Sequence, residues 1–100
     1  MSIVSVKELE NFDKEKNLLI DIRDRNKYLN GHIPGAINLG EREIFKQVDT
    51  FKNYEKVYVY CDYGNAALRI VNHIEENYDV HNIYSIIGGY YVYRGKIEKN

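Results

Sequence analysis

The chain has one cysteine, Cys61, which follows the alternating segment VYVY and precedes the loop residues DYGNAA. The thiolate form of a cysteine is the nucleophile, and backbone N–H donors and the positive end of a helix dipole both favour that form. Gly64 stands where a loop that folds around a small anion needs a positive φ or a close backbone approach. The spacing therefore indicates either a reactive thiol in a loop lined by N–H groups or a small buried residue that closes a strand.

The residues that commonly bind metals give no sign of a metal centre. His73 and His81 have no cysteine or carboxylate at a spacing known for metal ligands, and we expect both side chains to face solvent. The chemistry that the sequence suggests is therefore that of the thiol.

Alternating strands and helices are predicted to position this thiol. Strands are expected at 17–22, 36–40, 56–61 and 81–87, where apolar runs of strand length are bounded by turn residues. Helices are expected at 25–30 (capped by Asp24 and ended by Gly31), 41–51, 67–78 and 90–98, and a capping box at 5–8 would open another short helix. This order predicts a mainly parallel sheet covered on both faces, with functional groups at the carboxyl ends of the strands. Cys61 stands at such an end.

Length and composition limit the classes of protein to which the chain could belong. One hundred residues, 44% of them apolar, suit a single globular domain. Fourteen basic and fifteen acidic residues give a net charge of −1, which does not indicate a nucleic-acid partner. The first residues, MSIVSVKELENF, have neither the basic start and apolar run nor the cleavage site that would favour secretion. No apolar run is long enough to cross a membrane, and the single cysteine cannot form an intramolecular disulfide. We therefore expect a cytoplasmic protein that does not bind membranes.

Two segments resemble the signatures of rhodanese-type sulfurtransferase domains. LLIDIRDRNKYLNGHIPGAINL is similar to the first, an Asp-x-Arg strand end followed by Gly-His-Ile-Pro-Gly-Ala-x-Asn. The segment from VYVYCDYGNAALR to IIGGYYVY is similar to the second, a strand with Cys-x-x-Gly-x-Arg-Ser, a helix, another strand and a Gly-Gly turn. The two segments cover nearly the whole chain, so the resemblance identifies residues 1–100 as one rhodanese-like domain.

This resemblance implies an α/β fold with three layers, in which a central, mostly parallel five-stranded sheet is flanked by helices on both faces. It implies that Cys61 is the catalytic nucleophile, which takes sulfane sulfur from a small donor or a protein persulfide and passes it to a thiol acceptor. No metal or organic cofactor is implied. The backbone that would cradle the transferred sulfur belongs to Asp62, Tyr63, Gly64, Asn65, Ala66 and Ala67.

The chain departs from the family pattern within this loop. Ala66 stands where the family usually has arginine, Ala67 where it usually has serine, and Asp62 adds a negative charge. A hydrogen bond to a charged group is worth about 1.5–3 kcal/mol, so losing the arginine should weaken capture of the thiosulfate dianion roughly ten- to a hundredfold. A bound persulfide carries at most one charge, and backbone N–H groups can hold it. The sequence therefore favours persulfide relay over thiosulfate turnover.

Other residues of the two signatures have structural interpretations as well as functional ones. Asp21 and Arg23 could tune the site, but we expect an architectural ion pair, and we expect His32 to tie a turn rather than to act as a base. The resemblance implies an aromatic residue near the loop after Gly88 and Gly89, which we assign to Tyr93. Whether Arg23, Arg69 or Arg94 compensates for the missing loop arginine is left open.

Three functions compete. The first is a sulfurtransferase that works through a persulfide on Cys61, with weak thiosulfate activity. The second is a catalytically silent rhodanese module that binds a protein or senses redox state, an alternative that Asp62, Ala66 and Ala67 keep open. The third, phosphatase or arsenate-reductase chemistry, uses a Cys-x5-Arg loop whose arginine grips an oxyanion, and this chain lacks that arginine.

Overall fold

A computed structural model describes residues 2–99 of the chain. Its strands are β1 (Ile3–Val4), β2 (Asn17–Asp21), β3 (Ile37–Asn38), β4 (Lys56–Tyr60) and β5 (Ile83–Ile86). Its α-helices are α1 (Arg25–Asn30), α2 (Glu41–Lys46) and α3 (Asn65–Asn77), and three 3₁₀ helices are η1 (Val6–Asn11), η2 (Val48–Asn53) and η3 (Gly89–Val92). Among these described residues, no helix is long and apolar enough to pass through a bilayer.

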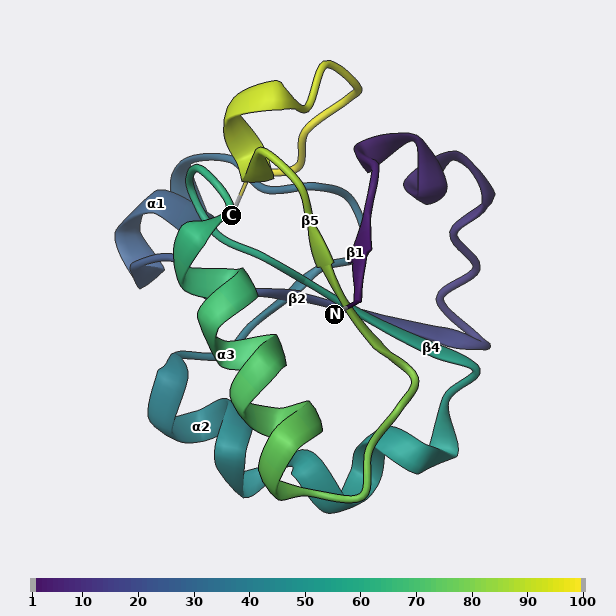
Figure 1. Cartoon of the computed structure of the whole chain (residues 1–100). Coiled ribbons are helices and arrows are strands. Elements are labelled where there is room, and N and C mark those ends of the chain that lie inside the picture. The colour runs from purple at the N-terminus through teal and green to yellow at the C-terminus, as the bar shows by residue number, and fades with distance from the viewer. Residues whose placement is uncertain (1, 100) are drawn as a thin grey trace.

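The five strands form one sheet in the order β1-β5-β4-β2-β3, and every neighbouring pair is parallel. The predicted five-stranded α/β fold is confirmed. Figure 1 shows β2 and β4 side by side in the middle of the fold, with α2 and α3 on one side of them. Asp21 pairs with Tyr60 in the register of these two strands, so both central strands end at the same edge of the sheet. This edge carries Cys61.

The segment VYVY builds both faces of the sheet. Successive side chains of a strand point to opposite faces. Val57 and Val59 belong to the core cluster beneath α2, η2 and α3, whereas Tyr58 and Tyr60 belong to a second cluster covered by η1, α1 and η3. All four side chains are buried. The alternation of valine and tyrosine therefore marks a strand buried on both sides, and it ends at the cysteine.

The single helix predicted over 41–51 is wrong, because α2 ends at Lys46 and η2 begins at Val48. Thr50 donates its backbone N–H and its hydroxyl to the carbonyl of Gln47, at 2.9 and 2.7 Å, which favours the tighter 3₁₀ turn. Val48 and Phe51 are buried all the same. The apolar spacing thus predicted which side chains face the core but not the break between the helices.

The terminal helix predicted over 90–98 is also wrong. The 3₁₀ helix η3 ends at Val92, and the chain continues in an irregular path to Glu98. Glu98 forms an antiparallel bridge with His32, with two backbone hydrogen bonds of 2.9 Å. A long-range contact therefore overrides the local helical tendency, and Gly95 in the same stretch weakens that tendency further.

The predicted helix caps are only partly formed. Ser5 caps η1 by accepting the N–H of Lys7 at 3.2 Å, but the carboxylate of Glu8 accepts the hydroxyl of Tyr58 at 3.1 Å instead of completing a capping box. Asp24 occupies the N-cap position of α1, where its side chain caps none of the described N–H groups of that helix. Gly31 ends α1 as predicted.

Candidate active site at Cys61

Cys61 follows β4 directly and is 7% exposed. Its Sγ atom accepts the backbone N–H of Gly64 at 3.1 Å and that of Ala67 at 3.3 Å. Gly64 is the N-cap of α3, and Ala67 lies in the first turn, where N–H groups have no partner within the helix. The sulfur atom therefore lies at the N-terminus of the longest helix, where the helix dipole and two N–H donors favour negative charge.

Glycines hold the loop in place. Gly64 has a φ of 106°, and a Cβ added to it would lie 2.9 Å from the backbone nitrogen of Gly88. Gly89 has a φ of 61°, and a Cβ there would lie 2.5 Å from the carbonyl oxygen of Cys61. The backbone N–H groups of Tyr90 and Tyr91 donate to the carbonyls of Cys61 and Asp62 at 2.9 and 3.0 Å. The Gly-Gly turn thus packs directly against the cysteine loop, and only residues without a Cβ allow this approach.

The outer side of the loop carries two exposed tyrosines and an ion pair. Tyr63 and Tyr91 are each 67% exposed, and their ring centroids lie 5.5 Å apart. Asp62 accepts a hydrogen bond from the ammonium group of Lys27 in α1, with 2.8 Å between Nζ and Oδ2. Residue types and spacing could not predict the Lys27 contact, because the two residues are 35 positions apart.

The assignment of the aromatic residue near the loop to Tyr93 is wrong. Tyr91 occupies that place, through its hydrogen bond to Asp62 and its ring contact with Tyr63. Tyr93 packs in the second core cluster, and its hydroxyl donates to the carbonyl of Lys96 at 2.6 Å. The short η3 turn explains the difference, because it points residues two positions apart in different directions.

The three arginines considered as substitutes for the loop arginine all have other partners. Arg69 pairs with Glu41 at 2.9 Å on the surface, and Arg94 donates to the carbonyls of Tyr91 and Tyr93 at 2.8 and 3.1 Å. Arg23 is bound to Asp21. Among the described residues, no arginine donates to Sγ, so Gly64 and Ala67 supply the hydrogen bonds that the sulfur receives.

Asp21 and Arg23 form the architectural ion pair that we expected. Arg23 Nη2 lies 2.8 Å from Asp21 Oδ2, and both side chains are buried. Arg23 also donates to the carbonyl of Gly31 at 2.6 Å and lies over the ring of Tyr90, 3.9 Å from its centroid. Burial opposes the charge of the guanidinium, but the pKa of Arg23 is raised because the hydrogen bonds and the charge of Asp21 outweigh that effect.

Tyr60 completes this buried cluster. Its hydroxyl donates to Asp21 Oδ2 at 2.7 Å and accepts the N–H of Ile33 at 3.1 Å. Burial and the nearby carboxylate of Asp21 raise the pKa of Tyr60 above its ordinary value, so this phenol stays neutral. The cluster therefore ties the end of β2 to the end of β4, next to the cysteine loop.

His32 ties a turn, as predicted. His32 is buried, with 2% of the residue exposed, and its ring stacks on Tyr28 with 3.8 Å between centroids. Its Nδ1 atom lies 2.8 Å from the carbonyl oxygen of Tyr28, and because a carbonyl only accepts, Nδ1 carries the proton of that bond. The predicted exposure of His73 and His81 is also confirmed.

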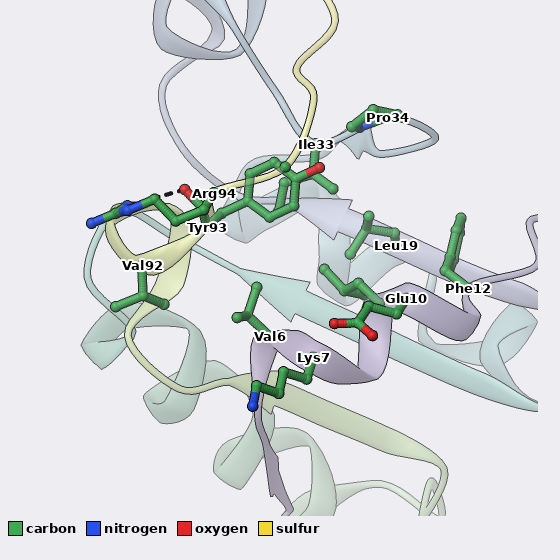
Figure 2. Close-up of a pocket in the computed structure, with 12 residues that line it drawn as sticks. Val6, Lys7, Glu10, Phe12, Leu19, Ile33, Pro34, Val92, Tyr93 and Arg94 are labelled. Carbon is green, nitrogen blue, oxygen red and sulfur yellow. Dashed lines mark hydrogen bonds between the residues drawn. The ribbon is translucent and has the colours of Figure 1, made fainter.

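An apolar hollow of about 600 Å³ lies apart from the loop, between η1 and the segment 92–95 (Figure 2). Apolar side chains such as Val6, Phe12, Leu19 and Ile33 line it, and none of the described residues 61–67 does. The chain from Gly89 to Gly95 therefore has two roles, because its first residues hold the cysteine loop and its last residues close this hollow.

This chain folds as a parallel five-stranded α/β domain, and its central strand ends in a cysteine loop. These two features together define the class of protein. The sequence profile of the rhodanese-like domain matches residues 5–96, and the chain belongs to this family. It is 33% identical over 86 residues to the adenylyltransferase and sulfurtransferase UBA4 of Candida albicans. The aligned region covers 77% of this chain and 19% of that protein. The chain is 29% identical over 89 residues to the thiosulfate sulfurtransferase GlpE of Shewanella oneidensis, with 87% of this chain and 86% of that protein covered.

The coverage of the relatives differs widely. The chain spans about a fifth of the length of UBA4, and 65% of protein YqhL of Bacillus subtilis, to which it is 30% identical over 83 residues. Solved structures agree on the fold. A rhodanese-like domain protein from Staphylococcus aureus has a TM-score of 0.80 at 21% identity, with 100% of this chain and 99% of that chain covered. A rhodanese with anions from E. coli has a TM-score of 0.68 at 24% identity, with 84% and 99% covered.

Proposed function

We propose that this protein is a sulfurtransferase in which Cys61 carries sulfane sulfur as a persulfide. The observation that carries the proposal is the pair of hydrogen bonds from Gly64 and Ala67 to Sγ, at 3.1 and 3.3 Å. Donors fixed at the place where a sulfur atom bears negative charge stabilise the attacking thiolate and the thiolate that leaves when the persulfide is used. Kinship with named sulfurtransferases supports the same chemistry.

The reaction has two balanced steps. In the first, the Cys61 thiolate attacks the outer sulfur of a donor R–S–SH, a new S–S bond forms on Cys61, and the bond within the donor breaks so that RS⁻ leaves with its electron pair. In the second, an acceptor thiolate attacks the outer sulfur of the Cys61 persulfide. The S–S bond on Cys61 breaks, the acceptor becomes a persulfide, and the Cys61 thiolate is restored.

The side chains of the loop favour donors of low charge. Ala66 and Ala67 provide neither a guanidinium nor a hydroxyl to an oxyanion, and Asp62 is an acid. Thiosulfate is a dianion, and its turnover depends more strongly on such groups than the transfer of sulfur between thiols does. We therefore expect polysulfides and protein persulfides to be better donors than thiosulfate.

A second candidate is the silent module. The 7% exposure of Cys61 and the two alanines favour it, because a buried thiol that receives no hydrogen bond from a basic side chain is commonly inert. This candidate predicts that Cys61 does not acquire sulfur from any donor.

Mass spectrometry of the intact protein distinguishes the two. The protein is incubated separately with polysulfide, thiosulfate and a cysteine desulfurase loaded with persulfide, and the Cys61→Ser variant serves as the control. The sulfurtransferase gains one sulfur atom on Cys61 and loses it when a small thiol is added, and this thiol appears as a persulfide. A wild-type mass that never changes with any of the three donors rejects the proposal in favour of the silent module.

A further inference from the structure

Lys27 and Asp62 form an ion pair at the mouth of the cysteine loop. Their Nζ and Oδ2 atoms lie 2.8 Å apart, and the two side chains are 55% and 36% exposed. Asp62 is the residue that follows Cys61, whereas Lys27 comes from α1, so the fold brings the ammonium group to the loop.

We propose that this pair keeps the charge near Cys61 balanced, so that the site neither attracts dianions, as an unpaired cation would, nor repels sulfane sulfur donors of low charge. The inference rests on the proposed function for its meaning in sulfur transfer, since it names the class of donor. In the wild-type protein the two charges cancel, and a donor without net charge meets no barrier at the loop.

The charged groups around the loop lead to this conclusion. Asp62 is the only acidic or basic residue among positions 62–67. Arg23 and Arg69 are paired with the carboxylates of Asp21 and Glu41, whereas Arg94 is held by the carbonyls of Tyr91 and Tyr93 and keeps its charge in every variant compared below. The hydrogen bond and the charge of Asp62 raise the pKa of Lys27, so this ammonium group stays charged at neutral pH. Lys27 and Asp62 are thus a pair of opposite charges at the loop, and either charge can be removed separately.

Removing either partner has opposite consequences. Asp62→Asn leaves the ammonium group of Lys27 uncompensated and supplies a cation near the loop that has Ala66 in place of arginine. Lys27→Gln leaves the carboxylate of Asp62, the residue that follows Cys61, uncompensated. Unit charges several ångströms apart near a protein surface change the rate with an anionic reagent by roughly three- to tenfold, upward in the first variant and downward in the second.

Alkylation of Cys61 measures this potential without any sulfur transfer. Iodoacetate is an anion and iodoacetamide is neutral, and both react with the same thiolate. The fraction of Cys61 present as thiolate affects both rates equally and cancels in their ratio. The ratio therefore depends on the charge near the thiolate. Because Cys61 is the only cysteine, the mass of the intact protein follows the reaction. Persulfidation by thiosulfate and by cysteine persulfide is measured on the same variants.

A matched control pair lies at the opposite end of β4. Lys56 and Glu8 are 3.6 Å apart with 48% and 41% of their side chains exposed, and Lys56 begins the strand that Cys61 follows. A strand of this length spans about 17 Å, which is twice the Debye length of about 8 Å at 0.15 M salt. Lys56→Gln and Glu8→Gln make the same changes of charge and should leave the ratio unchanged at that salt concentration.

The expected result is a higher ratio of iodoacetate to iodoacetamide rates for Asp62→Asn, a lower ratio for Lys27→Gln, and convergence of both toward the wild type in 1 M salt. The rate of persulfidation by thiosulfate, relative to the rate with cysteine persulfide, should likewise rise in Asp62→Asn and fall in Lys27→Gln. Equal ratios in all variants, shifts of the same sign, shifts matched by the control pair, or a thiol that reacts with neither reagent overturn the inference. If the alkylation ratios follow the expected order but Cys61 never gains sulfur, the proposed function is rejected and the role of the ion pair stands. If Cys61 gains sulfur but the alkylation ratios do not follow that order, the role of the ion pair is rejected and the proposed function stands.

Discussion

The two central strands end side by side, yet the polar groups at their ends are held in different ways. At the last residue of β2, the carboxylate of Asp21 receives the N–H of Arg23 at 2.8 Å, the guanidinium of the same residue, and the hydroxyl of Tyr60 at 2.7 Å. After β4, Cys61 Sγ receives two backbone N–H groups and no charged partner among the described residues. Buried side chains fix the first region, and backbone conformation fixes the second.

Because of this difference, we expect the Asp21 region to contribute mainly to the stability of the fold and the Cys61 region mainly to the reactivity of the thiol. A buried carboxylate with five hydrogen bonds cannot change its partners without a large penalty, so the Asp21 region acts as a fixed support. A sulfur atom bound by N–H groups can gain or lose a second sulfur while its donors stay in place. Substitutions should therefore lower the free energy of unfolding in the first region and alter the chemistry of Cys61 in the second.

The largest expected effect is the loss of Arg23. Arg23→Met leaves the buried charge of Asp21 without its partner, and removing one member of a buried pair destabilises proteins by about 3–5 kcal/mol. Urea unfolding followed by circular dichroism measures this change. Arg69→Met, which breaks the exposed pair with Glu41, is the control and should change stability little. If both variants unfold at the same urea concentration, the Asp21 region is not the support that we describe.

The second effect concerns Gly89. Gly89→Ala places a Cβ 2.5 Å from the carbonyl oxygen of Cys61 at a φ of 61°, and the strain and the clash together should destabilise the fold by about 2–4 kcal/mol. The cysteine loop must move, so the rate of persulfidation or alkylation of Cys61 should change beyond what the loss of stability explains.

Gly40→Ala is the matched control for Gly89. A Cβ at Gly40 meets only the flexible carboxylate of Glu43, at 3.3 Å, and its φ of −72° suits any residue. This variant should keep the reactivity of Cys61. A Gly89→Ala protein with the same stability and the same thiol reactivity as Gly40→Ala would show that the Gly-Gly turn does not hold the loop.

A smaller effect is expected at Tyr60, which joins the two regions. Tyr60→Phe removes the hydroxyl that donates to Asp21 and accepts from Ile33, and hydrogen bonds to charged groups contribute about 1.5–3 kcal/mol. Equilibrium unfolding should show this loss, while the ratio of iodoacetate to iodoacetamide rates at Cys61 should stay near that of the wild type. A change in the ratio without a change in stability would reverse the roles of the two regions.

The sequence allowed the scaffold of the site to be predicted because it depends on local periodicity. The alternation in VYVY reflects side chains that point to opposite faces of one buried strand, and the apolar run before Asp21 reflects its neighbour. The position of Cys61 at the carboxyl end of a central strand follows from these two patterns. Its role in sulfur transfer stays a prediction, because spacing indicates a nucleophile but not what it reacts with.

Contacts between distant segments could not be predicted. Lys27 and Asp62 are 35 positions apart, and only the fold brings them together. The bridge between His32 and Glu98 replaces the helix predicted over 90–98 for the same reason. The placement of Tyr91 rather than Tyr93 against the loop depends on the conformation of η3, which has no signal in residue types alone.

The smallest expected effect is a loss of stability at high pH that comes from Tyr58, which lies in the middle of β4 on the second face of the sheet. Burial and the hydrogen bond to Glu8 raise the pKa of Tyr58 from 10.0 to about 12. The folded state then holds this proton more tightly than the unfolded chain does. The stabilisation is present in full below pH 10 and is lost as the pH rises toward 12.

Urea unfolding of the wild type between pH 9 and roughly 12 should show this loss, and Tyr58→Phe should make the curve less steep because it removes one of the tyrosines whose pKa is raised. Tyr91→Phe, at a side chain that is 67% exposed, provides the control and should keep the slope of the wild type. A Tyr58→Phe curve as steep as that of the control would mean that the phenol is as well solvated in the folded protein as in the unfolded chain. In that case the second core face is more open to water around Glu8 than the 3% exposure of Tyr58 indicates.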